Sequence, residues 1–268
     1  MAVSPLISCL LVTLPVPERL ACLRESVRAY CRQTYKEKEL VIVFDGALPE
    51  SRAAIFAFVD ALERADIRIV ELPEPLSLGR LRNISRASAR GEILCHWDDD
   101  DLHHPERLEQ QFKALQASGR EAVYLQEVMQ FFPSSGTIYW TNWFATEAKG
   151  FPASLMCRGS ADIKYPEEGP TSVRGEDLVV AAQLHARCGV HLLAGMPHLY
   201  VYVSHGQNTW PDDHHRMLAT QLGISQGLLR RREAQLRNGL TAFDFGQETI
   251  AVQGNNGLAF TLGHRSAC

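Results

Sequence analysis

Four short, largely apolar runs dominate the first hundred residues of this 268-residue chain. Segments whose apolar residues recur at helical spacing separate these runs, which span residues 6–13, 40–44, 67–72 and 93–97. A strand with one face in water alternates apolar and polar residues, so unbroken apolar strands indicate a sheet that is covered on both faces. Strands that alternate with helices in this way predict an α/β fold, in which helices flank a mostly parallel sheet.

Helical spacing is found over residues 18–33, 51–64, 77–90 and 105–117. Ser77 is a suitable N-cap for the third of these helices, and Gly91 fits the position that follows its last turn. Polar residues at the carboxyl ends of the strands are candidates for a ligand site, because ligands of parallel sheets bind at that edge. Asp45 follows the second strand, and four aspartates follow the fourth.

The second half of the chain is less regular. Residues 123–132 and 137–144 predict two antiparallel strands around a Pro-Ser-Ser-Gly turn, and 149–174 predict loops. Residues 176–187 predict a helix and 198–204 a strand. Residues 210–237 predict a long amphipathic helical stretch, and 253–257 a turn between two short strand-like pieces. We therefore expect a domain over 1–206 and a C-terminal helical extension and tail over 207–268, packed on the same domain.

Composition excludes several classes of protein. The chain has 27 Lys and Arg against 31 Asp and Glu, a net charge of −4, which argues against bulk electrostatic binding of nucleic acid or anionic membranes. Seven scattered cysteines without a Cys-x-x-Cys pair argue against disulfides and zinc, and predict reduced thiols in the cytoplasm. The apolar run over 6–16 is too short for a transmembrane segment and follows no basic residues, so no signal peptide is expected. Peripheral contact with the inner face of the membrane and oligomer formation stay open.

An acidic run is the most informative motif. Trp97 is followed by Asp98, Asp99, Asp100 and Asp101 at the end of the fourth predicted strand. Four adjacent carboxylates repel one another, and a divalent cation such as Mg²⁺ or Mn²⁺ would relieve that repulsion. In an extended segment the first and third side chains would point to one side and the second and fourth to the other. A solvated acidic turn before the helix at 105–117 explains the run equally well.

Further motifs precede and follow the acidic run in a fixed order. They are the opening strand over 5–13, Gln-Thr-Tyr at 33–35, Val-Ile-Val-Phe-Asp-Gly at 41–46, Gly-x-x-Arg-Asn at 79–83, Gly-Glu-Ile at 91–93, Gly-Glu-Asp at 175–177 and Ser-His-Gly at 204–206. Together with the acidic run and Pro105 they resemble the family 2 glycosyltransferases over residues 5–206. The resemblance implies a GT-A fold with a Rossmann-like sheet, and a nucleotide-sugar donor, a UDP-sugar above others.

The resemblance also implies a role for each matching residue at the donor. Thr13 would lie beside the nucleoside and Asp45 would contact the nucleobase. Asp98 would face the ribose or sugar, with Asp99 in the same donor site, and Arg82 would reach the diphosphate.

The resemblance also implies residues for metal binding and for the acceptor. Asp100 would bind Mn²⁺ or Mg²⁺, and His205 would add a metal or diphosphate contact. Asp177 would be the general base for the acceptor hydroxyl, and Glu176 beside it would position the acceptor or the metal shell. A base on the face opposite the diphosphate would give inversion at the anomeric carbon.

Three departures concern the nucleotide. Leu14 and Pro15 stand where the family has an aromatic residue and Asn, so a stacking partner for the base is missing. Phe44 replaces the first Asp of an Asp-Asp-Gly triplet, and Ala47 replaces the usual Ser.

We therefore expect a metal-dependent inverting glycosyltransferase that uses a glycan or lipid-linked acceptor in glycan or polysaccharide assembly, with no nucleic-acid partner. Two alternatives stay open: a catalytically inactive nucleotide-sugar binding module, and a nucleotidyltransferase on a related fold. A nucleotidyltransferase would need a Gly-rich basic loop after the first strand, but residues 13–17 contain no glycine.

Overall fold

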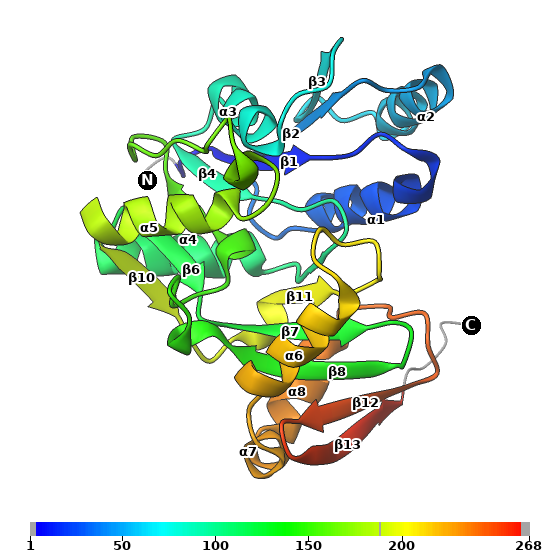
Figure 1. Cartoon of the computed structure of the whole chain (residues 1–268), viewed down its shortest axis with the longest axis vertical. Coiled ribbons are helices and arrows are strands. Elements are labelled where there is room, and N and C mark those ends of the chain that lie inside the picture. The colour runs from blue at the N-terminus through cyan, green and yellow to red at the C-terminus, as the bar shows by residue number, and fades with distance from the viewer. Residues whose placement is uncertain (1–3, 188, 264–268) are drawn as a thin grey trace.

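The computed structural model describes residues 4–187 and 189–263, and its strands form two sheets (Figure 1). The first sheet has seven strands in the order β10-β6-β9-β4-β1-β2-β3. Its strands are β1 (Ile7–Val12), β2 (Lys38–Asp45), β3 (Ile67–Leu72), β4 (Ile93–His96), β6 (Ala122–Leu125), β9 (Met156–Arg158) and β10 (Val190–Leu193). All pairs are parallel except those that β9 makes with β4 and β6. The expected α/β fold with a mostly parallel sheet is confirmed.

Helices cover both faces of this sheet, as the unbroken apolar strands predict. In β2, Leu40, Ile42 and Phe44 pack in one core, and Val41 and Val43 pack in another on the opposite face. The first face is covered by α1 (Leu20–Cys31), α2 (Pro49–Asp60) and α4 (Arg107–Ser118). The second is covered by α3 (Leu78–Ser88) and α5 (Glu176–Arg187).

Strand β9 lies in the stretch that the sequence predicts to be loops, so that prediction is wrong for these three residues. The strand is inserted between β4 and β6, and its residues Met156 and Cys157 pack into the cores on opposite faces of the sheet. A three-residue strand carries too little alternation to be recognised from its sequence.

The second sheet has six strands in the order β13-β12-β8-β7-β11-β5. They are β5 (Leu102–His103), β7 (Glu127–Phe132), β8 (Thr137–Asn142), β11 (Tyr200–Val203), β12 (Thr249–Gly254) and β13 (Gly257–Gly263). The predicted hairpin is present as the antiparallel pair β7–β8. However, the run that predicts a single strand over 123–132 is divided at Gln126, because its first part is β6 of the other sheet.

The C-terminal part is not one long helix. Residues 210–237 contain α6 (Asp212–Leu222), α7 (Gln226–Arg231) and the beginning of α8 (Glu233–Leu240). The first break comes at Gly223, where the backbone is extended, and the Ser225 side chain caps α7. The predicted turn over 253–257 is present between β12 and β13, and β12 pairs with β8. The C-terminal part thus contributes strands β12 and β13 to the second sheet, in addition to its helices (Figure 1).

Two local predictions at α3 have different outcomes. The Ser77 side chain accepts a hydrogen bond from the backbone N–H of Arg80, so the N-cap is confirmed. Gly91 is not in the left-handed region that ends a helix, since α3 already ends at Ser88. Gly91 instead permits a close approach, because a Cβ there would lie 2.6 Å from the Leu6 carbonyl oxygen.

Cys9, Cys22, Cys31 and Cys95 are free thiols, and Cys188 and Cys268 lie outside the described residues. Within the described ranges, every helix is too short or too polar to cross a bilayer.

Candidate active site

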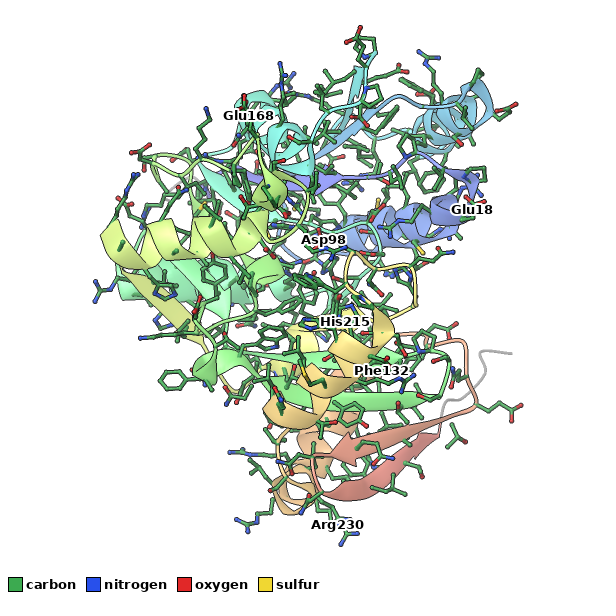
Figure 2. The ribbon with its side chains drawn as sticks, viewed as in Figure 1. Glu18, Asp98, Phe132, Glu168, His215 and Arg230 are labelled. Atoms are coloured by element: carbon green, nitrogen blue, oxygen red, sulfur yellow. The ribbon has the colours of Figure 1, made fainter. Side chains whose placement is uncertain are left out.

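The acidic run lies where the chain passes from one sheet to the other. It joins β4 of the first sheet to β5 of the second. Figure 2 shows Asp98 near the centre of the molecule, between the elements of the first sheet and the helix that carries His215. The site therefore combines the carboxyl ends of parallel strands with side chains from the second sheet.

The chain bends through the acidic run, so the expected alternation of its side chains is wrong. Asp99 and Asp100 both contact the guanidinium of Arg19, which lies just before α1. Asp99 also accepts a hydrogen bond of 2.5 Å from the Thr13 hydroxyl at the end of β1. These contacts satisfy both carboxylate oxygens of Asp99, whose side chain is only 4% exposed.

The other two aspartates meet at Tyr200 in β11. The Tyr200 hydroxyl lies 2.5 Å from Asp101 Oδ2 and 3.4 Å from Asp98 Oδ2. Asp101 Oδ1 accepts the backbone N–H of Val203, so this buried carboxyl fastens the acidic run to β11. Burial and the nearby Asp100 and Asp98 raise the pKa of Asp101 well above its usual range. Asp101 thus has a structural role, which the resemblance did not assign.

Arg82 in α3 joins the acidic run to the Gly-Glu-Asp motif. Its Nε donates to Glu176 Oε1 at 2.8 Å, and its Nη2 lies 3.3 Å from Asp98 Oδ1. The same Asp98 oxygen lies 2.8 Å from Nε2 of His96, which is buried in β4. These side chains come from α3, α5, the end of β4 and the acidic run that follows it, and they form one network at the centre of the site.

Asp177 lies at the first turn of α5, after Gly175, whose φ of +81° is in the left-handed region that favours glycine. Its Oδ1 accepts the backbone N–H of Leu178 at 2.8 Å. Burial and the repulsion of Glu176 and Asp98 raise the pKa of Asp177 to about 7, although Arg82 opposes the shift. A carboxylate with such a pKa is a suitable general base at neutral pH.

His205 approaches the acidic run from the loop after β11. Its Nε2 lies 3.0 Å from Asp100 Oδ2, and its Nδ1 accepts the backbone N–H of Gln207. Hydrogen bonds from the Asn208 side chain to Val203 and from the His205 N–H to that side chain hold the loop in place. Because Nδ1 accepts this bond, a neutral His205 carries its proton on Nε2, and that proton must leave or move to Nδ1 before Nε2 can bind a metal.

The donor set at Asp100 and His205 fits a divalent ion. Neighbouring ligands of an octahedral Mg²⁺ or Mn²⁺ lie about 3 Å apart, and Asp100 Oδ2 and His205 Nε2 are separated by 3.0 Å. The site gathers six carboxyl groups (98–101, 176 and 177), and the salt bridges of four of them go to only two guanidinium groups, so an added cation would reduce the repulsion. Nowhere in the described ranges do three acidic, His or Cys side chains converge on one metal position, so phosphate or water oxygens would have to complete the shell.

Some predicted residues lie apart from this network. Asp45 ends β2 and accepts the backbone N–H of Leu76, and none of the contacts described above reaches it. Trp140 is buried in the core of the second sheet, so its ring is not available to stack on a sugar. Trp210 is covered by the guanidinium of Arg174 at 4.9 Å and by the ring of His214 at 4.7 Å.

Two residues of the network were missed from the sequence, namely Arg19 and Tyr200. Arg19 had a usable signal, because it is a basic residue in the first turn of the helix predicted over 18–33, near the ligand-binding edge of the sheet. Tyr200 lies in a short apolar strand near the C-terminal part, and nothing in its surroundings distinguishes it from a core tyrosine.

Comparisons with known proteins agree with this architecture. Residues 12–165 match the model of the family described as glycosyl transferase family 2. An uncharacterised glycosyltransferase of Methanocaldococcus jannaschii is 32% identical over 136 residues, which are 50% of this chain and 45% of that protein. The amylovoran biosynthesis glycosyltransferase AmsE of Erwinia amylovora is 26% identical over 121 residues, 45% of each chain. The chain spans about half the length of the curated relatives it matches.

Solved structures share the fold. S. aureus TarS 1–349 in complex with UDP has a TM-score of 0.58 at 13% identity, over 88% of this chain and 74% of that one. The mannosyltransferase PcManGT from Pyrobaculum calidifontis, in complex with GDP-Man and Mn²⁺, has a TM-score of 0.58 at 15% identity, over 87% of this chain and 64% of that one. At these identities the likeness shows the GT-A fold alone.

Proposed function

This chain belongs to glycosyl transferase family 2, and from that premise we propose that it is a metal-dependent inverting glycosyltransferase. It moves a sugar from a nucleoside-diphosphate donor to an acceptor hydroxyl. The observation that carries the proposal is the single Arg82 side chain that contacts both Asp98 and Glu176. This contact holds a donor-side carboxylate and the base-bearing motif in one site.

In this proposal Asp100 and His205 hold Mn²⁺ or Mg²⁺. The bound ion supplies Lewis-acid stabilisation of the negative charge that builds up on the leaving diphosphate. The side chains of Thr13, Asp45, Asp98 and Asp99 surround the nucleoside and sugar of the donor. Two of them are already fixed, because Asp99 binds Thr13 and Arg19 before any donor arrives.

Asp177 is the general base. The acceptor oxygen forms a bond to the anomeric carbon while the bond from that carbon to the diphosphate oxygen breaks, and the hydroxyl proton passes to the Asp177 carboxylate. Its pKa of about 7 makes it a stronger base than an ordinary Asp and leaves it largely ionised just above neutral pH. Glu176 keeps its contact with Arg82 and positions the acceptor side of the site.

A UDP-sugar is our proposed donor, and an acceptor in glycan or polysaccharide assembly is the proposed target. A fold likeness to a UDP complex and a GDP-mannose complex supports a nucleotide-sugar, and AmsE is named for the biosynthesis of a polysaccharide.

A donor-turnover assay tests the proposal. The protein is incubated with UDP-glucose, UDP-galactose, UDP-N-acetylglucosamine or GDP-mannose, with Mn²⁺ or with a chelator, and nucleoside diphosphate release is measured with and without a panel of sugar acceptors. We expect Mn²⁺-dependent release with at least one donor, and its loss in Asp100→Asn. Metal-dependent nucleotide binding without release from any donor would favour the inactive binding module instead.

A further inference from the structure

Arg19 lies on the carboxylate that we assign to the metal. Its Nη1 is 3.0 Å from Asp100 Oδ2, and its Nη2 contacts Asp99 Oδ1. The same Asp100 oxygen lies 3.0 Å from His205 Nε2. One oxygen thus meets two positively polarised groups of the chain at the place where a metal ion would bind.

The surroundings of Arg19 distinguish this pair from an ordinary surface salt bridge. The Arg19 side chain is 16% exposed, and the side chains of Asp99 and Asp100 are 4% and 13% exposed. Burial opposes the charge of Arg19, but Asp100 and Asp99 outweigh it and raise the pKa of the guanidinium, which remains charged. Pairs that are shielded from water in this way are weakened little by salt, so Arg19 would not leave without a replacement partner.

One hydrogen-bond donor of Arg19 has no partner among the described residues. Its Nε is buried and makes no hydrogen bond to any described residue. A buried donor without a partner costs free energy, so a ligand with several acceptor oxygens would gain from meeting Arg19. A diphosphate is such a ligand, and guanidinium groups suit phosphate oxygens better than the single contact to Asp100.

We infer that Arg19 is an internal counter-ion that competes with the divalent metal for Asp100 and moves to the donor diphosphate when the metal binds. The inference rests on the proposed function and makes Arg19 a donor-positioning residue. Metal alone would have to displace a buried guanidinium from Asp100, whereas metal with diphosphate supplies that guanidinium with new acceptors. Each ligand therefore raises the affinity of the other, and linkage requires the two effects to be equal.

Mn²⁺ binding to the metal-free protein tests this inference without any turnover. Calorimetry or the Mn²⁺ spin-resonance signal gives the Mn²⁺ affinity with and without saturating UDP, for the wild type, Arg19→Met, Arg19→Gln and Arg19→Lys. Arg28→Met is the matched control, because Arg28 is an exposed arginine of α1 that pairs with Glu25. Circular dichroism establishes that each variant is folded.

For the wild type we expect UDP to tighten Mn²⁺ binding at least tenfold, and Mn²⁺ to tighten UDP binding by the same factor. Arg19→Met should bind Mn²⁺ alone at least tenfold more tightly than the wild type, about 1.4 kcal/mol. Its coupling to UDP should be at least tenfold weaker than that of the wild type, and the coupling that remains comes from phosphate oxygens that bind the metal directly. Arg19→Lys keeps the charge and should stay near the wild type. Arg19→Gln loses the charge but keeps a polar side chain, should behave like Arg19→Met, and keeps the inference testable if Arg19→Met does not fold. Arg28→Met should match the wild type throughout.

Two results separate the inference from the proposed function. If the wild type binds Mn²⁺ in the presence of UDP but Arg19→Met has the same Mn²⁺ affinity and coupling, the counter-ion role is wrong and metal dependence stands. If neither protein binds Mn²⁺ with or without UDP, metal dependence is wrong and the counter-ion role falls with it.

Discussion

Replacing Asp177 by Asn is the sharpest test of the assigned base. The amide keeps the size of the side chain and its contact with the Leu178 N–H but cannot accept the acceptor's proton. General-base catalysis contributes about 10²–10⁴ in rate, so transfer should fall by that factor. Nucleotide binding should stay within twofold, because none of the contacts of Asp177 described above involves the proposed metal ligands.

The pKa of Asp177 fixes the pH dependence of the wild type. With a pKa of about 7, the base is roughly 9% ionised at pH 6 and 91% at pH 8, so kcat/KM for the acceptor should rise about tenfold between them. An Asp with an ordinary pKa near 4 would give a flat profile over this range. The residual activity of Asp177→Asn should show no such rise.

Asp162→Asn is the matched control. Its side chain is 94% exposed and pairs with Arg187, so this variant makes the same change of charge away from the site. Initial rates of nucleoside diphosphate release at saturating donor, from pH 5.5 to 8.5, give the comparison. Turnover by Asp177→Asn within fivefold of the wild type, with the same pH profile, would refute the assignment.

Asp177→Asn should also change how the stability of the protein depends on pH. The folded pKa of Asp177 lies above its ordinary value of 3.8, so the folded protein holds a proton that the unfolded chain releases. This contribution to stability is complete below about pH 4 and is lost as the pH rises through about 7. Its upper limit is about 4 kcal/mol, from three pKa units at 1.36 kcal/mol each. Relative to the wild type, Asp177→Asn should therefore gain stability between pH 4 and pH 8 in urea unfolding.

Two further substitutions test the frame of the site. Arg82→Met removes the cation shared by two shielded carboxylates, so it should lower the free energy of unfolding in urea by about 3 kcal/mol and remove most of the transfer activity. In the control Arg52→Met, half of the arginine side chain is exposed, so the loss of unfolding free energy should be less than about 1 kcal/mol. Gly79→Ala would place a Cβ 1.8 Å from the Pro166 carbonyl oxygen and should lower stability by more than about 2 kcal/mol. Gly227→Ala meets no atom within 4 Å and should raise stability by up to about 1 kcal/mol, so equal effects of the two glycine variants would contradict the close packing at Gly79.

Strands β1, β2 and β4 of the first sheet could be predicted because they are buried on both faces. Such strands appear as apolar runs that need no knowledge of their neighbours, and β2 shows the reason, with alternate residues in two separate cores. Position at the carboxyl edge then indicated the acidic run and Asp45 as candidates for a ligand site. The association of Asp177 with the acidic run came only from the family resemblance, because no periodicity connects residues 98 and 177.

The second sheet could not be predicted in the same way. Strand β5 has two residues and pairs with a strand that is remote in sequence. A strand this short is determined by its partner more than by its own residues. The division of residues 122–132 between two sheets likewise depends on a change of direction at Gln126 that no turn residue marks.

The site lies between the two sheets, so the contacts and pKa values of its carboxylates depend on residues that are far apart in sequence. Asp100 meets His205 across 105 positions of sequence, and Asp98 meets Tyr200 across 102. In the separate segments these carboxylates would be solvated and have ordinary pKa values. In the folded protein they compete for two guanidinium groups, and the pKa of Asp99 rises to about 6. The chemistry therefore depends on how the second sheet docks against the first. A substitution at Asp101, which fastens β11 to the acidic run, should disturb metal and base functions together.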